Sequence, residues 1–285
     1  MTNVYAPSGS RILPRILAMP TGRIGVVLTI LIVLAAVLAP LLLPNGPNAI
    51  DVQSRLQAPS ASHLLGTDQL GRDIFARVAA GLRVAIVISL IVVTLSLAIG
   101  ATLGTTAAML GGWPDRVIVI LFDTISAFPA VVLALAIIAL YGSQISNLVL
   151  LVALVFVPHF GRIARAQTMV LRNAPFIAAG RLIGLSVPEI ILRHVVPNTI
   201  GPLLVVASMD IPVVITIEAG LSFLGLGVPP PTPSLGTLLR DGYVYLQQSP
   251  WPVAVSAAAL ALLTLSSTLL GEAVRDAVDP RLQTR

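Results

Sequence analysis

The stretch Arg172–Pro202, with the sequence RNAPFIAAGRLIGLSVPEIILRHVVPNTIGP, decides how the rest of the chain is organised. Long apolar runs flank it on both sides, and none of them contains so many Arg, Glu, His, Gly and Pro residues. The pattern predicts two short helices separated by a break. Such a polar hairpin between apolar segments indicates a docking surface for a soluble partner, although an ordinary interfacial loop helix would give the same local pattern.

The first helix of this hairpin has recognisable signals at both ends. Pro175 suits a first helical turn, where its missing N–H is not needed. Phe176–Ile183 can continue the helix, and Gly184 suits a left-handed C-terminal cap.

The second helix is predicted by a capping box. Ser186 provides the hydroxyl at the N-cap, and Glu189 follows three residues later. Glu189 and Arg193 form an i,i+4 pair in the favourable order. Pro197 is expected to end this helix.

The composition places the chain among integral membrane proteins. Of its 285 residues, 56% are hydrophobic and only 10% are charged. This hydrophobic fraction exceeds what a soluble domain needs to fill its core. The net charge is +5, and every basic residue is Arg. These arginines lie between apolar runs with few aromatic neighbours, so membrane topology explains them better than nucleic-acid binding. The absence of cysteine excludes disulfides, thiol catalysis and Cys-ligated metal.

Six apolar runs predict transmembrane helices, because about 20 residues cross a hydrocarbon core of ~30 Å. They are Ile24–Leu43, Val84–Leu110, Val117–Leu140, Ile145–Gly161, Ile200–Leu221 and Trp251–Leu270. Between and around them we expect a cytoplasmic leader (1–23), external loops (44–83 and 223–250), the hairpin (172–198) within a core of five helices (84–275), and a cytoplasmic tail (276–285). A cleaved signal peptide is the alternative for the first run, but the run is long for that role and Pro40 follows the most favourable cleavage point.

The distribution of arginine predicts the orientation. With both termini inside, twelve arginines lie in inner segments and five in outer segments. This bias follows the positive-inside rule and places the hairpin in the cytoplasm.

Other polar residues are weaker candidates for function. Asp210 lies at membrane depth, where acidic residues usually face protein or water, so it is a candidate for a translocation pathway, with a helix break or an inter-subunit contact as the alternative. Glu218 is expected to be solvated near the outer end. His63, Asp68 and Asp73 give only a loose metal-site pattern. We interpret that segment as structural instead, with Thr67 or Asp68 capping a short surface helix.

Four motifs in chain order resemble one family. They are GTDQLGRD at 66–73, the hairpin, EAGLSFLGLGVPPPTP at 218–233, and VRDAVDPR at 274–281. Together they resemble the second (C-type) permease subunit of dipeptide, oligopeptide and nickel ABC importers. The hairpin is similar to that family's cytoplasmic "EAA" loop, except that Ala178 stands where Glu is usual.

The resemblance implies a fold and a role for the hairpin. The fold is an all-α integral membrane protein of the ABC type I importer permease class, with six transmembrane helices. The hairpin is then the coupling helix that sits in a groove on the ATP-hydrolysing subunit. The coupling residues it implies are Ala178, Ala179, Gly180, Arg181, Gly184, Glu189, His194, Pro197 and Asn198.

The resemblance also implies partners and a location. The partners are a B-type permease subunit, one or two ABC ATPase subunits, an extracytoplasmic substrate-binding protein and membrane lipid, in a bacterial plasma membrane. ATP and magnesium would be bound by the ATPase partners, since this chain has no GxxxxGK[ST] motif, and neither catalytic residues nor a metal or cofactor site are expected in it. Short peptides are the expected substrate, with nickel, glutathione or opines as alternatives. An ion-gradient-driven transporter is the other class, and it predicts inverted repeats and paired broken helices.

Overall fold

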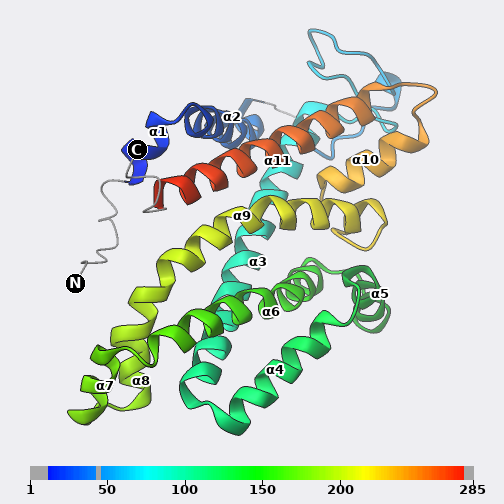
Figure 1. Ribbon diagram of the computed structural model, residues 1–285. Helices are drawn as coiled ribbons and strands as arrows, with labels where there is room; N and C mark the ends of the chain where they lie inside the picture. Colours follow the sequence, from blue (N-terminus) through cyan, green and yellow to red (C-terminus); the bar gives the residue numbers. More distant parts are fainter. Residues whose placement is uncertain (1–11, 43–45, 279–285) are drawn as a thin grey trace.

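The computed structural model describes residues 12–42 and 46–278, and it is almost entirely helical (Figure 1). The predicted leader as far as residue 11, residues 43–45 of the first loop and tail residues 279–285 lie outside the described residues. The helices are α1 (Ile12–Ala18), α2 (Pro20–Leu42), α3 (Ile74–Leu110), α4 (Gly112–Ser126), α5 (Ala130–Tyr141), α6 (Ile145–Leu171), α7 (Pro175–Leu182), α8 (Val187–Ile190), α9 (Val196–Phe223), α10 (Leu235–Val244) and α11 (Trp251–Val278). A 3-10 turn, η2 (Val52–Ser54), and a π-helical turn, η3 (Ile191–Val195), complete them.

The number of membrane spans agrees with the six that the sequence predicts if α4 and α5 together count as the third span. Within the described residues, five helices are long and apolar enough to cross a membrane, or up to six if one bent pair counts as a span. The bent pair is α4 and α5, which meet at 88°. Pro129 stands at the N-cap of α5, and its missing N–H prevents the continuation of α4. The predicted third span, Val117–Leu140, contains the Phe128-Pro129 break that the sequence indicates, and the chain bends there.

The first of the predicted external loops ends differently from the prediction. Thr67 and Asp68 do not cap a separate surface helix, because both are buried in the loop. Asp73 is the N-cap instead, and its Oδ1 accepts the Ala76 N–H at 2.9 Å. The helix that begins there is α3 itself, which runs without interruption to Leu110. The surface segment and the second span are thus one helix.

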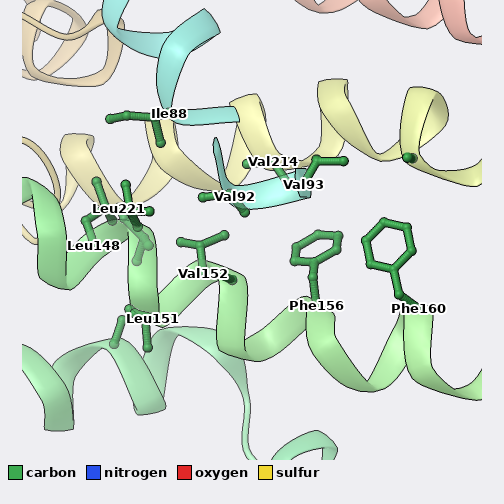
Figure 2. Close-up of a cluster of buried hydrophobic side chains, with 14 of the residues drawn as sticks. Ile88, Val92, Val93, Leu148, Leu151, Val152, Phe156, Phe160, Val214 and Leu221 are labelled. Carbon is green, nitrogen blue, oxygen red and sulfur yellow. The ribbon is translucent and has the colours of Figure 1, made fainter. Parts of the chain in front are cut away.

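The core lies where α3, α6 and α9 pack together. Its buried side chains are labelled in Figure 2 and include Ile88, Val92, Val93, Leu148, Leu151, Val152, Phe156, Phe160, Val214 and Leu221. Small residues let α3 and α6 approach closely, as is typical of membrane helices. A Cβ on Gly100 would lie 2.5 Å from the carbonyl oxygen of Val157.

An ion pair adds a further connection between the helices. Arg165 of α6 donates from Nε and Nη2 to the two carboxylate oxygens of Asp115 on α4, at 2.6 and 2.7 Å. The planar guanidinium and carboxylate match in this two-bond arrangement. It fixes the beginning of α4 to the last third of α6.

The two predicted external segments lie together at one end of the bundle, and the hairpin of α7 and α8 lies at the other (Figure 1). Ile74, at the start of α3, packs in one buried cluster with Leu235 and Leu238 of α10. At the opposite end, Met109 of α3 packs with Ile177, Ile190 and Val195 of the hairpin. The predicted external segments and the hairpin are thus held by separate buried clusters.

Candidate functional site

The hairpin begins as the sequence predicts. Pro175 lies in the first turn of α7, and the preceding Ala174 has an extended backbone. The helix ends at Leu182, and Gly184 adopts a left-handed conformation with φ +85°. The Leu185 N–H donates to the Gly180 carbonyl at 3.0 Å, and the Gly184 N–H donates to the Arg181 carbonyl at 3.1 Å. This pair of bonds is the Schellman cap, so glycine sets the sharp turn of the hairpin.

Glu189 restarts the helix in the predicted way, but it does not pair with Arg193. Its Oε2 accepts the Ser186 N–H at 2.9 Å and the Ser186 hydroxyl at 2.8 Å. These bonds turn the carboxylate back toward the N-terminus of α8. The predicted ion pair between Glu189 and Arg193 is therefore absent from the described part of the chain.

The prediction that Pro197 ends the second helix is wrong. Pro197 lies in the first turn of α9, and α8, η3 and α9 follow one another without a loop. The π-helical turn makes this possible, because its wider ring shifts the hydrogen-bond register: the Val196 N–H donates to the Ile191 carbonyl. The Asn198 side chain donates from Nδ2 to the His194 carbonyl at 2.6 Å. The hairpin is therefore continuous with α9.

One side of the hairpin is anchored in the bundle. Ile177, Ile190 and Val195 are fully buried, and they surround Met109 near the end of α3. Gly180 is also buried, and a Cβ there would lie 3.3 Å from Leu185. The ring of His194 packs against Phe176, with centroids 6.1 Å apart. On this side the hairpin packs against α3 and is continuous with α9.

The other side is an exposed apolar tip next to a basic groove. Leu182 and Ile183 are 88% and 78% exposed. An open groove beside them is lined by Arg172, Asn173, Ala178, Arg181 and Leu182. The groove lining contains two arginines and no acid. Among the predicted coupling residues, Ala178, Ala179, Arg181, Gly184, Pro197 and Asn198 are exposed, whereas Gly180 is buried.

Asp210, the candidate pathway residue, has a partner that the sequence did not indicate. Its Oδ2 lies 3.3 Å from Nε2 of His159 on α6. The two residues are far apart in the chain, and no local pattern connects them. A histidine at membrane depth is itself a signal, but it does not name its partner.

Glu218 is not solvated as expected, because it is 1% exposed. Its Oε1 accepts the Ser222 hydroxyl at 2.7 Å, and Ser222 Oγ accepts the Val228 N–H at 3.1 Å. The carboxylate thus holds the loop after α9 by way of a serine. No local sequence pattern indicates that this loop folds back over the helix end.

The predicted external loop that contains the motif 66–73 is built around two buried side chains, Asp68 and Arg77. Asp68 accepts the N–H groups of Leu70 and Arg72 at 2.8 and 3.0 Å, and the Arg72 Nε at 2.7 Å. Nε of Arg77 lies 3.3 Å from the same carboxylate. Nδ1 of His63 contacts Asp73 at 2.9 Å. These residues stabilise the loop, in line with the structural interpretation of this segment. The helix cap, however, is Asp73 and not Thr67 or Asp68.

Comparison with known proteins identifies the architecture. Residues 100–284 match the model of the family described as binding-protein-dependent transport system inner membrane component. The chain belongs to this family. It is the permease subunit of an ABC importer, as the sequence motifs indicated, and not the ion-gradient-driven transporter considered beside it.

Three relatives and one solved structure illustrate the match. The chain is 37% identical to the dipeptide transport system permease protein DppC of Alkalihalophilus pseudofirmus, over 92% of this chain and 86% of the relative. It is 36% identical to the glutathione transport system permease protein GsiD of Pectobacterium atrosepticum, over 90% and 85%. It is 34% identical to the probable D,D-dipeptide transport system permease protein DdpC of Escherichia coli, over 96% and 92%. The inward-facing MetNI methionine ABC transporter shares the fold with TM-score 0.55 and 15% identity, over 70% of this chain and 95% of that chain.

Proposed function

We propose that this permease carries short peptides across the bacterial plasma membrane, as one half of a heterodimer with a B-type permease subunit. The support comes from the relatives, whose names specify dipeptides, D,D-dipeptides and glutathione, itself a small peptide. A substrate-binding protein would deliver the peptide from outside. One or two ABC ATPase subunits, which bind the ATP and magnesium, would provide the energy.

The observation that carries the coupling role is the two-sided hairpin. One side is buried against α3, and the other presents Leu182 and Ile183. Exposed apolar side chains of this size mark contact sites for another protein. We therefore assign residues 172–198 to the ATPase contact, and both termini to the cytoplasm on the same side.

The groove beside the tip specifies the chemistry of this contact. Ala178 removes the acid usual in the family, so Arg172 and Arg181 line the groove without a carboxylate among its lining residues. An arginine pairs well with a carboxylate of a partner. The ATPase surface that fits here is an apolar pocket with an acidic residue at its rim.

The experiment compares two substitutions of Gly184 in the complete complex. Valine strongly disfavours the left-handed conformation, which costs an L-residue roughly 1–2 kcal/mol, whereas asparagine tolerates it. A Cβ at this position meets nothing within 4 Å, so backbone conformation alone separates the two variants. We expect Gly184→Val to lose ATP-driven uptake of dialanine and trialanine in proteoliposomes, and Gly184→Asn to retain most of it.

Three results would contradict the proposal. The first is equal uptake by both variants, which would remove the hairpin from the mechanism. The second is uptake that continues without ATP or without an ATPase subunit. The third is transport of Ni²⁺ but of no peptide when the cognate binding protein is supplied, which would overturn the substrate assignment alone.

A further inference from the structure

Four ionisable side chains lie in two close pairs on α4, α6 and α9. The helix α6 runs from 145 to 171 and α9 from 196 to 223, so His159 and Asp210 lie beside the midpoints of their helices. On the neighbouring helix α4, Asp123 is about 16 Å from the start at Gly112, at 1.5 Å per residue. Arg162 lies one turn from His159. We call Asp123, His159, Arg162 and Asp210 the polar band.

Short contacts link the band in two pairs. Nε2 of His159 lies 3.3 Å from Oδ2 of Asp210. Arg162 donates from Nη2 to Oδ1 of Asp123 at 2.9 Å and to the Ser126 hydroxyl at 3.1 Å. His159 and Arg162 are three residues apart on one helix, so they share a face. The band thus extends across α4, α6 and α9.

Three of the four side chains of the band are exposed, on helices that belong to the predicted spans. The side chains of His159, Arg162 and Asp123 are 48%, 51% and 63% exposed, and that of Asp210 is 13% exposed. A charged side chain in hydrocarbon is costly, and such residues face a bundle interior or a water-filled cavity. This exposed face must therefore border water or the second permease subunit.

A different cavity at membrane depth lacks these features. It has a volume of about 290 Å³ and lies between α2, α3, α9 and α11, where it is lined by Ile211, Ile215 and other mostly apolar residues. None of the band residues lines it. Its chemistry suits an acyl chain, whereas the band suits an ionic solute.

We propose that the polar band lines the translocation pathway and contacts the charged ends of the passing solute. This inference rests on the proposed function. The band holds two carboxylates, one guanidinium and one imidazole, so its charges nearly balance. Such a surface fits a dipolar solute: Arg162 would meet a carboxylate, and Asp123 or Asp210 would meet an ammonium group. The existing pairs would exchange partners as the solute passes.

The absence of cysteine makes a direct test possible. Asp123→Cys, His159→Cys and Arg162→Cys are made singly in the complete complex, with partner subunits that also lack cysteine. Leu265→Cys is the control, because Leu265 is 49% exposed near the middle of α11 and lies outside the band. Each complex is treated in proteoliposomes with two membrane-impermeant thiol reagents, one a sulfonate and one a trimethylammonium.

We expect the three band positions to react and the control to remain unlabelled. Arg162→Cys leaves the acids and should prefer the cationic reagent, whereas Asp123→Cys should prefer the anionic one, each by about tenfold. Dialanine supplied with the binding protein and ATP should slow the labelling. Size-exclusion chromatography of each complex shows that the subunits are still assembled.

The outcomes separate this inference from the proposed function. If the assembled complex imports peptides but the band positions do not react, the band is sealed against the partner subunit and the inference is wrong. Labelling equal to that at Leu265→Cys, or without charge preference, would overturn it as well. If the band reacts with the expected preference but no peptide is imported, the pathway assignment holds and the assignment of peptides as the substrate is wrong.

Discussion

Gly104 of α3 lies so close to Gly161 of α6 that a Cβ on Gly104 would overlap the backbone carbonyl of Gly161. Phe122 of α4 fills the other side of Gly161 and is 1% exposed. Three helices thus meet at one point with no spare volume. This crossing determines how the helices that lead to the hairpin are held together.

Gly104→Ala should therefore destabilise the protein. Overpacking of a filled site typically costs about 1–3 kcal/mol, and here the obstacle is backbone, which cannot rotate away. We expect a lower midpoint of thermal unfolding in detergent. Gly201→Ala is the matched control, because a Cβ on Gly201 of α9 would meet nothing within 4 Å. Equal midpoints for the two variants would mean that the crossing is not close-packed.

Asp68→Ala should be one of the most damaging changes in the external loop. The Asp68 carboxylate faces Arg77, and both side chains are only 4% exposed. Removing one partner of a buried pair leaves an uncompensated charge, which costs about 3–5 kcal/mol. We expect a sharp fall in the yield of folded protein and in its thermal midpoint.

The control for Asp68 is Asp51→Ala, because Asp51 is an exposed residue that bonds only to its own turn. This variant should retain the normal yield and midpoint. If Asp68→Ala and Asp51→Ala behave alike, the buried pair does not organise the loop.

The double change Leu182→Asp and Ile183→Asp should weaken the ATPase contact without unfolding the permease. Burial of one such apolar side chain contributes about 1.5–3 kcal/mol, so the dissociation constant should rise more than tenfold. Binding of the isolated ATPase to the permease dimer in nanodiscs measures it. Leu64→Asp, at a 63% exposed position in the external loop, should leave binding unchanged. Wild-type affinity in the double variant would contradict the assignment of the tip.

The sequence predicted features that depend on local chemistry. Gly184 and the Ser186–Glu189 capping box each act within a few residues, and both are found as predicted. The apolar runs predicted the spans for a similar reason, because span length follows from membrane thickness.

Features that depend on contacts between distant segments could not be predicted. The break between α4 and α5 was indicated by Pro129, but its 88° angle depends on packing. The continuation of the hairpin into α9 requires a π-helical turn, for which Pro197 gave the opposite signal. Glu218 was expected to be solvated. That prediction was wrong because the loop that buries Glu218 folds back from further along the chain. His159 and Asp210 are brought together only by the packing of α6 on α9.

The most direct test of the central claim is site-specific cross-linking from the tip of the hairpin. Ile183→Cys provides a single thiol in this chain, in a complex whose partners lack cysteine, and a photoreactive thiol probe attached there captures its neighbour in the intact membrane. We predict a cross-link to the ATPase subunit whose yield changes when ATP is bound. A cross-link to the external substrate-binding protein, or modification of this thiol by an impermeant reagent added outside intact cells, would contradict the account.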